Sequence, residues 1–230
     1  MVSEDMRERI RPLVPSHVPV HVIHSGKDPD GYPPKVPSTS VRRILAVGRL
    51  VEKKGHDDAI KAVGYARARG ADVSLRIIGD GPLRQELGAL IRREGASGYV
   101  SMSGGLPHDQ VIHAMREADA VMLACRTGRD GDMEGIPNVL KEAQLMGLPV
   151  VATRHSGVPE VVPEGNQRWL ANEGDWQRLG ELLCELVATA PEDRRLQVVR
   201  GRQHVLGEFS VQEEVLRHLR LYDRLVHGRN

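Results

Sequence analysis

The stretch that decides the fold is Asp132–Gly157, DMEGIPNVLKEAQLMGLPVVATRHSG. Pro137 suits the first position of a helix, because its missing N–H would have no intrahelical partner there and its φ is already helical. Gly147 suits the position just past the end of that helix, where a left-handed residue is common. The apolar run Pro149–Thr153 that follows is typical of a parallel strand covered on both faces. The stretch therefore predicts a loop, a helix and a buried strand in that order.

Apolar runs of this kind recur along the chain and alternate with helical patterns. The alternation predicts an α/β fold built on a single Rossmann-like, doubly wound parallel sheet. Glycine and polar residues follow each run, and in such a sheet these loops meet at the carboxyl edge of the strands, where ligands bind. The predicted strands are Arg43–Val47, Leu75–Ile78, Tyr99–Ser103, Ala120–Ala124 and Pro149–Thr153.

Two glutamates, Glu134 and Glu142, bracket the start of the predicted helix. Free N–H groups and the helix dipole favour an anion such as a pyrophosphate at that helix N-terminus. A carboxylate repels phosphate, so the natural partners of the glutamates are hydroxyl groups, which sugars supply. The pair predicts a nucleotide-sugar site. In the alternative interpretation, Glu142 lies on a solvated helix face and Glu134 interacts only with the helix dipole, for about 0.3–1 kcal/mol of stability.

The loop Gly48–Gly55, GRLVEKKG, carries the second half of the predicted chemistry. If the nucleotide sugar at such a site donates its glycosyl group, a nucleoside diphosphate is left, so the transition state needs positive charge directed at the departing oxygen. Arg49 and Lys54 are the candidates, and charge-assisted hydrogen bonds of this kind contribute about 1.5–3 kcal/mol each without a metal. The alternative is a solvated basic turn ahead of the helix predicted at residues 57–69.

These motifs together carry a family resemblance. The two glutamates, the run Gly147-Leu-Pro-Val-Val-Ala-Thr153 and Gly157-Val-Pro-Glu160 resemble the signature of retaining glycosyltransferases of the GT-B fold. That family, the group 1 or family four type, includes enzymes that build bacterial surface polysaccharides. The resemblance implies that Glu134 contacts the donor sugar and Glu142 the ribose hydroxyls.

The resemblance also implies the remaining site residues. Arg49 and Lys54 would grip the donor pyrophosphate, and the catalytic set would be Arg49, Lys54 and Glu134. No metal and no other cofactor is expected, because the nucleotide sugar is itself the substrate. The implied donor-binding residues are Gly48, Arg49, Lys54, Glu134, Gly135, Ile136, Asn138, Val139 and Glu142.

GT-B enzymes have two Rossmann-like domains, and the donor binds in the C-terminal one. The resemblance therefore predicts that residues 41–210 form the nucleotide-sugar-binding domain, the C-terminal half of a GT-B fold. Residues 1–40 would be a remnant of the acceptor domain, with a strand at Val18–Ile23, followed by an interdomain linker. Residues 211–230 would form a helix crossing the interdomain cleft, with exposed Leu216, Leu219 and Val226.

The predicted function is nucleotide-sugar binding in a retaining glycosyltransferase that transfers a hexose to a glycan or lipid-linked acceptor. The isolated chain is expected to be inactive unless an N-terminal acceptor domain is supplied in cis or by a separate chain. A stand-alone nucleotide or nucleotide-sugar binding module without transfer activity is one alternative. Another GT-B-like enzyme, such as a sugar-nucleotide epimerase, is a second alternative.

Composition excludes several other classes of protein. A formal net charge of +1 without a clustered basic block gives no nucleic-acid surface. No apolar run approaches the roughly 20 residues that span a bilayer, and the N-terminus lacks a signal-peptide core. A cytoplasmic protein, peripheral to the membrane that holds a lipid-linked acceptor, is expected. Cys125 and Cys184 lack metal-ligand spacing and are expected to be reduced and buried.

Some motifs have two interpretations. Gly79-Asp80-Gly81-Pro82 predicts a plain turn, because Arg84 stands where a dinucleotide fingerprint needs its third glycine. Asn138, His155 and Glu160 either contact the ligand or cap local backbone groups.

Overall fold

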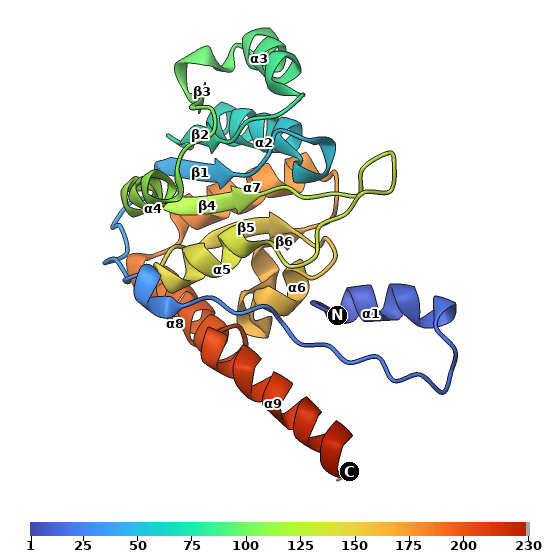
Figure 1. Ribbon diagram of the computed structural model, residues 1–230. Helices are drawn as coiled ribbons and strands as arrows, with labels where there is room; N and C mark the ends of the chain where they lie inside the picture. Colours follow the sequence, from blue (N-terminus) through green and yellow to red (C-terminus); the bar gives the residue numbers. More distant parts are fainter. Residues whose placement is uncertain (229–230) are drawn as a thin grey trace.

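The computed structural model describes residues 1–228, which contain a six-stranded parallel sheet in the order β3-β2-β1-β4-β5-β6 (Figure 1). From β1 the chain moves outward to β3 and then returns to the other side of β1, so the direction of winding reverses between β1 and β4. The predicted Rossmann-like, doubly wound sheet is confirmed. The strands are β1 Arg43–Val47, β2 Ser74–Ile78, β3 Val100–Met102, β4 Ala120–Leu123, β5 Val150–Thr153 and β6 Leu170–Ala171.

Helices cover both faces of the sheet and enclose two apolar clusters. α2, α3 and α7 pack on one face, and α4 and α5 pack on the other, with α8 against α5 (Figure 1). Every residue of β4 and β5 is buried, as expected for central parallel strands covered on both faces. The helices are α1 Glu4–Ile10, α2 His56–Ala68, α3 Arg84–Arg93, α4 His108–Glu117, α5 Asn138–Leu145, α6 Val158–Val161, α7 Trp176–Ala188, α8 Pro191–Glu208 and α9 Val211–His227. Single 3₁₀ turns lie at η1 Arg11–Leu13, η2 Pro29–Gly31, η3 Glu52–Lys54 and η4 Ala96–Gly98, with a longer one at η5 Glu164–Trp169.

The loop, helix and strand predicted from Asp132–Gly157 are present. Pro137 has an extended ψ of 121° and lies just before the first residue of α5, one position earlier than predicted. Gly147 has a φ of +76° just past the helix end, so the predicted left-handed position is confirmed. A side chain there would also crowd the Lys35 carbonyl, at 3.2 Å.

The two ends of the chain differ in how well the sequence predicted them. The strand predicted at Val18–Ile23 is wrong: this segment belongs to no strand, because no strand lies beside it to accept its hydrogen bonds within residues 1–228. It contacts the N-terminus instead, through the Ile23 N–H and the Met1 carbonyl. At the other end, α9 leaves Leu216, Leu219 and Val226 between 45% and 75% exposed, as predicted.

Asp119 fastens the start of the sheet to the segment before it. Its carboxylate precedes β4 and accepts hydrogen bonds from the Ser38 hydroxyl, the Arg42 and Arg43 N–H groups and the Arg43 guanidinium, at 2.6–3.1 Å. Burial alone would raise the pKa of Asp119, but the hydrogen bonds from Arg43, Ser38 and Arg42 outweigh it and lower the pKa to about 2. The ionised carboxylate therefore stabilises the folded state.

Asp119→Asn keeps the shape of the side chain and removes its charge. The free energy of unfolding near pH 7 is expected to fall by about 1.5–3 kcal/mol, the range for hydrogen bonds to a charged group. Because the folded-state pKa of Asp119 is lower than the unfolded value, its stabilisation is complete above about pH 4 and is lost as pH falls toward about 2. Urea unfolding of both proteins at several pH values measures the difference. A difference that stays constant down to about pH 3 would contradict the assignment.

Candidate functional site

The loops at the carboxyl edge of the sheet are joined by backbone hydrogen bonds. The Gly48 N–H donates to the Ile78 carbonyl at 3.0 Å, and the Gly79 N–H donates to the Gly104 carbonyl at 2.8 Å. Gly79 is a glycine because a Cβ there would lie 1.9 Å from the Gly48 carbonyl oxygen. The loops after β1, β2 and β3 thus form one continuous rim, and the plain turn predicted at Gly79–Pro82 has a structural reason.

The basic loop after β1 holds Lys54 against Glu134. The Lys54 stem passes over Gly48, where an added Cβ would lie 3.1 Å from Cδ and Cε of the lysine. Its Nζ lies 3.1 Å from Glu134 Oε2, and Lys53 Nζ lies 3.4 Å from Glu134 Oε1. Arg49 in the same loop is exposed and makes no ion pair within residues 1–228. The structure therefore brings together the Lys54 and Glu134 that the sequence predicted, and adds Lys53.

Groups beneath this loop fix its path. His56 is buried, and its Nε2 lies 3.2 Å from the Gly48 carbonyl oxygen. Burial lowers the pKa of His56, which favours a neutral ring that donates to this carbonyl. Gly55 has a φ of +60° and approaches the end of β4 so closely that a Cβ would lie 1.8 Å from the Ala124 oxygen. The backbone of this loop therefore lies directly against the residue that follows β4, and position 55 has no room for a side chain.

The backbone of Glu134 is anchored separately from its side chain. Its N–H donates to His155 Nε2 at 3.0 Å, and Nδ1 of the same ring lies 2.6 Å from Glu173 Oε1. Glu173 Oε2 also accepts the Thr127 N–H at 2.8 Å. Of the two interpretations of His155, the structure favours capping of a local backbone group.

Glu142 lies in a second charged cluster. It is 7% exposed, and its Oε1 contacts Lys27 Nζ at 2.7 Å and the Tyr32 hydroxyl at 3.2 Å. The Tyr32 oxygen is also 3.0 Å from His108 Nε2, at the start of α4. Burial and the neighbouring Glu142 charge raise the pKa of Tyr32, so it remains a hydroxyl donor. The solvated helix face considered for Glu142 is therefore wrong.

Four other predicted site residues lie in or beside the start of α5. Gly135 accepts the Gly157 N–H at 3.2 Å and is covered by side chains of the N-terminal segment. Ile136 packs against the same Gly157, Asn138 is exposed, and Val139 is buried in the apolar core.

Glu160 caps a helix other than its own. Its carboxylate accepts the N–H groups of Glu4 and Asp5, at 2.9–3.2 Å, and lies 3.0 Å from His24 Nε2. The Ser156 hydroxyl donates to Asp5 at 2.8 Å. The turn after β5 thus docks α1 beside the rim, and Glu160 is used in backbone capping.

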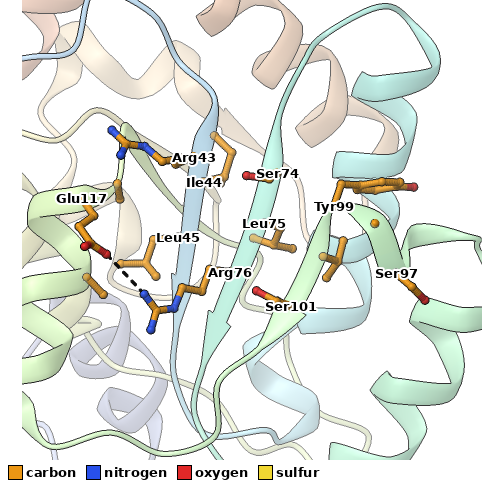
Figure 2. Close-up of a pocket in the computed structure, with 14 residues that line it drawn as sticks. Arg43, Ile44, Leu45, Ser74, Leu75, Arg76, Ser97, Tyr99, Ser101 and Glu117 are labelled. Atoms are coloured by element: carbon orange, nitrogen blue, oxygen red, sulfur yellow. Dashed lines mark ion pairs between the residues drawn. The ribbon is translucent and has the colours of Figure 1, made fainter.

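A separate hollow of about 340 Å³ lies over the sheet face beside α4 (Figure 2). Figure 2 shows Arg76 directed toward Glu117, and their closest charged atoms are 3.6 Å apart. Arg76 Nε also donates to the Ser103 hydroxyl at 2.9 Å. Arg76 is therefore already paired with neighbouring polar groups, and none of the predicted site residues lines the hollow.

Comparison with known proteins assigns the family. Residues 33–203 match the model of the glycosyl transferases group 1 family. The chain belongs to this family. It is 38% identical over 169 residues to the putative colanic acid biosynthesis glycosyltransferase WcaL of Salmonella typhimurium, covering 74% of this chain and 42% of that protein. It is 32% identical over 170 residues to a GDP-mannose-dependent alpha-(1-6)-phosphatidylinositol monomannoside mannosyltransferase of Mycolicibacterium smegmatis, covering 73% of this chain and 44% of that protein.

The fold of this group 1 domain is also found in solved structures. TarM of S. aureus, crystallised as a point mutant with UDP among its ligands, superposes with a TM-score of 0.81 at 16% identity. The match covers 96% of this chain and 43% of TarM. The group 1 chain thus spans less than half the length of these relatives.

Several residues beside this candidate site were not predicted from the sequence. Lys53 stands next to Lys54, and the doublet was the only signal available for it. Lys27 and Tyr32 belong to no motif and lie more than 100 residues from Glu142 in the chain. Only the path of the segment before β1 brings them there.

The two cysteines differ in how deeply they are buried. Cys125 and Cys184 are free; Cys125 is fully buried, which raises its pKa to about 12, and Cys184 is partly buried. Within residues 1–228, no cluster of three His, Cys, Asp or Glu side chains suited to a metal ion occurs. Among the described helices, none is both long and apolar enough to cross a bilayer.

Gly55→Ala tests the close approach of the basic loop to β4. The substitution is expected to lower the free energy of unfolding by about 3–5 kcal/mol, because the new Cβ clashes with the Ala124 carbonyl. Gly95→Ala is the matched control, since Gly95 has a φ of +63° and no atom within 4 Å of an added Cβ. Only left-handed strain, roughly 1–2 kcal/mol, is expected there. Equal losses in urea unfolding would show that the clash is relieved by movement of the loop.

Proposed function

We propose that this chain is the nucleotide-sugar-binding domain of a retaining glycosyltransferase. Its reaction would be the transfer of a hexose to a glycan or lipid-linked acceptor. The observation that carries the proposal is the contact between Glu134 and the basic loop, with Lys54 Nζ at 3.1 Å and Lys53 Nζ at 3.4 Å. A carboxylate suited to sugar hydroxyls lies beside ammonium groups suited to phosphate, at the carboxyl edge of a doubly wound sheet.

Binding of the proposed donor would break the internal ion pair between Lys54 and Glu134. The pyrophosphate of the donor would bind Lys54 and Arg49, and the hydroxyls of the transferred sugar would then donate hydrogen bonds to Glu134. At the other end of the donor, Glu142 would accept the ribose hydroxyls. The relative from Mycolicibacterium smegmatis is named as dependent on GDP-mannose, and the TarM crystal contained UDP, so both support a nucleotide-sugar donor.

Leaving-group stabilisation is the proposed catalytic role of the basic loop. As the bond between the anomeric carbon and the diphosphate oxygen breaks, negative charge develops on the departing oxygen, and Arg49 and Lys54 would stabilise it. The acceptor oxygen would form the new bond to the anomeric carbon on the same face of the sugar, and its proton would pass to the departing diphosphate oxygen. Since the two cations neutralise the diphosphate, we propose that no metal is needed.

The acceptor site would lie in the part of the relatives that this chain does not match. Holding an acceptor against the donor contributes roughly 7–11 kcal/mol to such a reaction, and the residues described here supply one wall of the site. We therefore propose that residues 1–230 alone bind the donor but transfer the sugar negligibly. A lipid-linked acceptor would place the reaction at the inner face of the membrane, with the cytoplasmic protein peripheral to it.

Nucleoside diphosphates test the donor site directly. Binding to the folded chain is expected to stabilise it by about 2.7 kcal/mol at a hundredfold excess over the dissociation constant. UDP and GDP should be compared by thermal unfolding, with and without EDTA, and the stabilisation should survive EDTA. Absence of a shift with both diphosphates at millimolar concentration would argue against the donor site, and loss of the shift in EDTA would argue against metal independence.

The two glutamates are expected to respond differently to substitution. Glu142→Gln should weaken the binding of UDP and of UDP-glucose equally, or of GDP and of GDP-mannose equally, by about 1.5–3 kcal/mol for a lost charged hydrogen bond. Glu134→Gln should weaken the nucleotide sugar and leave the diphosphate unchanged or slightly tighter, because it frees Lys54 from its internal partner.

Calorimetric titration, at a temperature at which each variant is fully folded, measures the affinity of both variants for both ligands. Glu117→Gln, an exposed carboxylate that pairs with Arg76 away from the rim, is the control. Efficient sugar transfer by the purified chain would contradict the proposed need for an acceptor domain. If both variants bind both ligands as tightly as wild type does, neither glutamate contacts the ligand, which would favour a stand-alone binding module that uses other residues.

A further inference from the structure

A buried histidine lies behind the proposed sugar contact. His155 is 0% exposed and follows β5, and Glu173 follows β6. Neither residue takes part in the proposed transfer. Between them they bind the backbone at Thr127 and at Glu134, which lie near the two ends of the loop that joins β4 to α5.

The hydrogen bonds fix which ring nitrogen of His155 carries the proton. A backbone N–H can only donate, so Nε2, 3.0 Å from the Glu134 nitrogen, must accept and carries no hydrogen. The ring proton is then on Nδ1 and is donated to Glu173 Oε1 at 2.6 Å. Burial acts to raise the pKa of Glu173, but hydrogen bonds from the Thr127 N–H and His155 outweigh it and lower the pKa. An ionised Glu173 thus holds a neutral His155 in the tautomer that accepts from Glu134.

The hydrogen bond from the Glu134 N–H to His155 holds the Glu134 backbone while its side chain is attracted to two lysines. Lys53 and Lys54 both draw the carboxylate toward the loop after β1. The backbone of Glu134 is held from the opposite side, by the turn after β5. A carboxylate that must exchange an ammonium group for a sugar hydroxyl needs a backbone that stays in place during the exchange, because a displacement of about 1 Å is enough to lose the contact geometry.

We propose that His155 is a positioning residue that places Glu134 for the donor sugar through the Glu134 backbone N–H, with Glu173 holding the imidazole tautomer. This role rests on the proposed function, in which Glu134 contacts the transferred sugar. It predicts that His155 affects the affinity for the nucleotide sugar through Glu134 and leaves the affinity for the nucleoside diphosphate nearly unchanged.

Two conservative variants separate the two bonds of the ring. The amide of Asn reaches the place of Nδ1, so His155→Asn can still donate to Glu173 but loses the acceptor for the Glu134 N–H. The longer amide of Gln reaches the place of Nε2, so His155→Gln keeps that acceptor. His155→Asn is expected to weaken UDP-glucose or GDP-mannose about three- to tenfold, the worth of one hydrogen bond. His155→Gln should restore most of the loss, and UDP or GDP should change less than about twofold in either variant.

A double-mutant cycle with Glu134→Gln provides the decisive test. Calorimetric titrations of the full chain compare wild type, His155→Asn, Glu134→Gln and the double variant, each with a nucleotide sugar and its diphosphate. If His155 acts through Glu134, His155→Asn has no further effect on nucleotide-sugar affinity once Glu134 is changed. His113→Asn is the control, since within residues 1–228 this exposed histidine pairs only with Glu117 on α4.

Several outcomes would overturn the proposal. An equal loss for nucleotide sugar and diphosphate, or an undiminished loss in the Glu134→Gln background, would assign His155 a general structural role. If His155→Asn does not fold, Glu173→Gln replaces it in the same cycle, because Glu173 is partly exposed and its loss leaves the tautomer unfixed. Wild-type chain that binds neither ligand would remove the proposed function together with this role, whereas binding without coupling would remove the positioning role alone.

Discussion

The carboxyl ends of parallel strands share one edge of a sheet, and this constraint determines where chemistry can occur in the molecule. The reversal between β1 and β4 separates the loops on either side of it, and the basic loop and the loop carrying Glu134 flank that point. Close packing of glycine backbones then fixes how these loops lie against one another, since Gly79 packs against the Gly48 carbonyl and Gly55 packs against the Ala124 carbonyl. Charged side chains from distant parts of the sequence are thereby held within ion-pair distance.

The sequence was informative where burial or backbone conformation requires a particular type of residue. The apolar runs predicted the sheet because buried parallel strands exclude polar side chains, and Gly147 marked the end of α5 because its φ is positive. Placing both loops at the carboxyl edge predicted that Lys54 and Glu134 lie on one rim, but the ion pair between them was not predicted. Helix boundaries were predicted less well than the elements themselves. Pro137 precedes α5 instead of being its first residue, because neither position requires a backbone N–H.

Contacts made by the segment before β1 were beyond sequence reasoning. Lys27 and Tyr32 lie on either side of η2 and both contact Glu142 of α5, and nothing in the local sequence pattern specifies that path. Val18–Ile23 has the composition of a strand, but a strand also needs a neighbour, which the pattern of one segment cannot reveal. His155 was recognised as a candidate, yet the positioning role proposed for it depends on Glu173, which carried no sequence signal of its own.

The pairing of Lys54 with Glu134 bears on how the rim responds to ionic strength. Dissolved salt weakens attraction between exposed charges, and for a vacant basic site this would lower the affinity for an anionic ligand steadily. In the proposed donor complex, the incoming phosphate would compete with a carboxylate already in place. The Lys54 and Glu134 side chains are only 14% and 15% exposed, so salt screens their ion pair much less than it screens the exposed Arg49. The salt dependence of anion affinity would therefore come mainly from Arg49, while the competition from Glu134 would change little with the surrounding electrolyte.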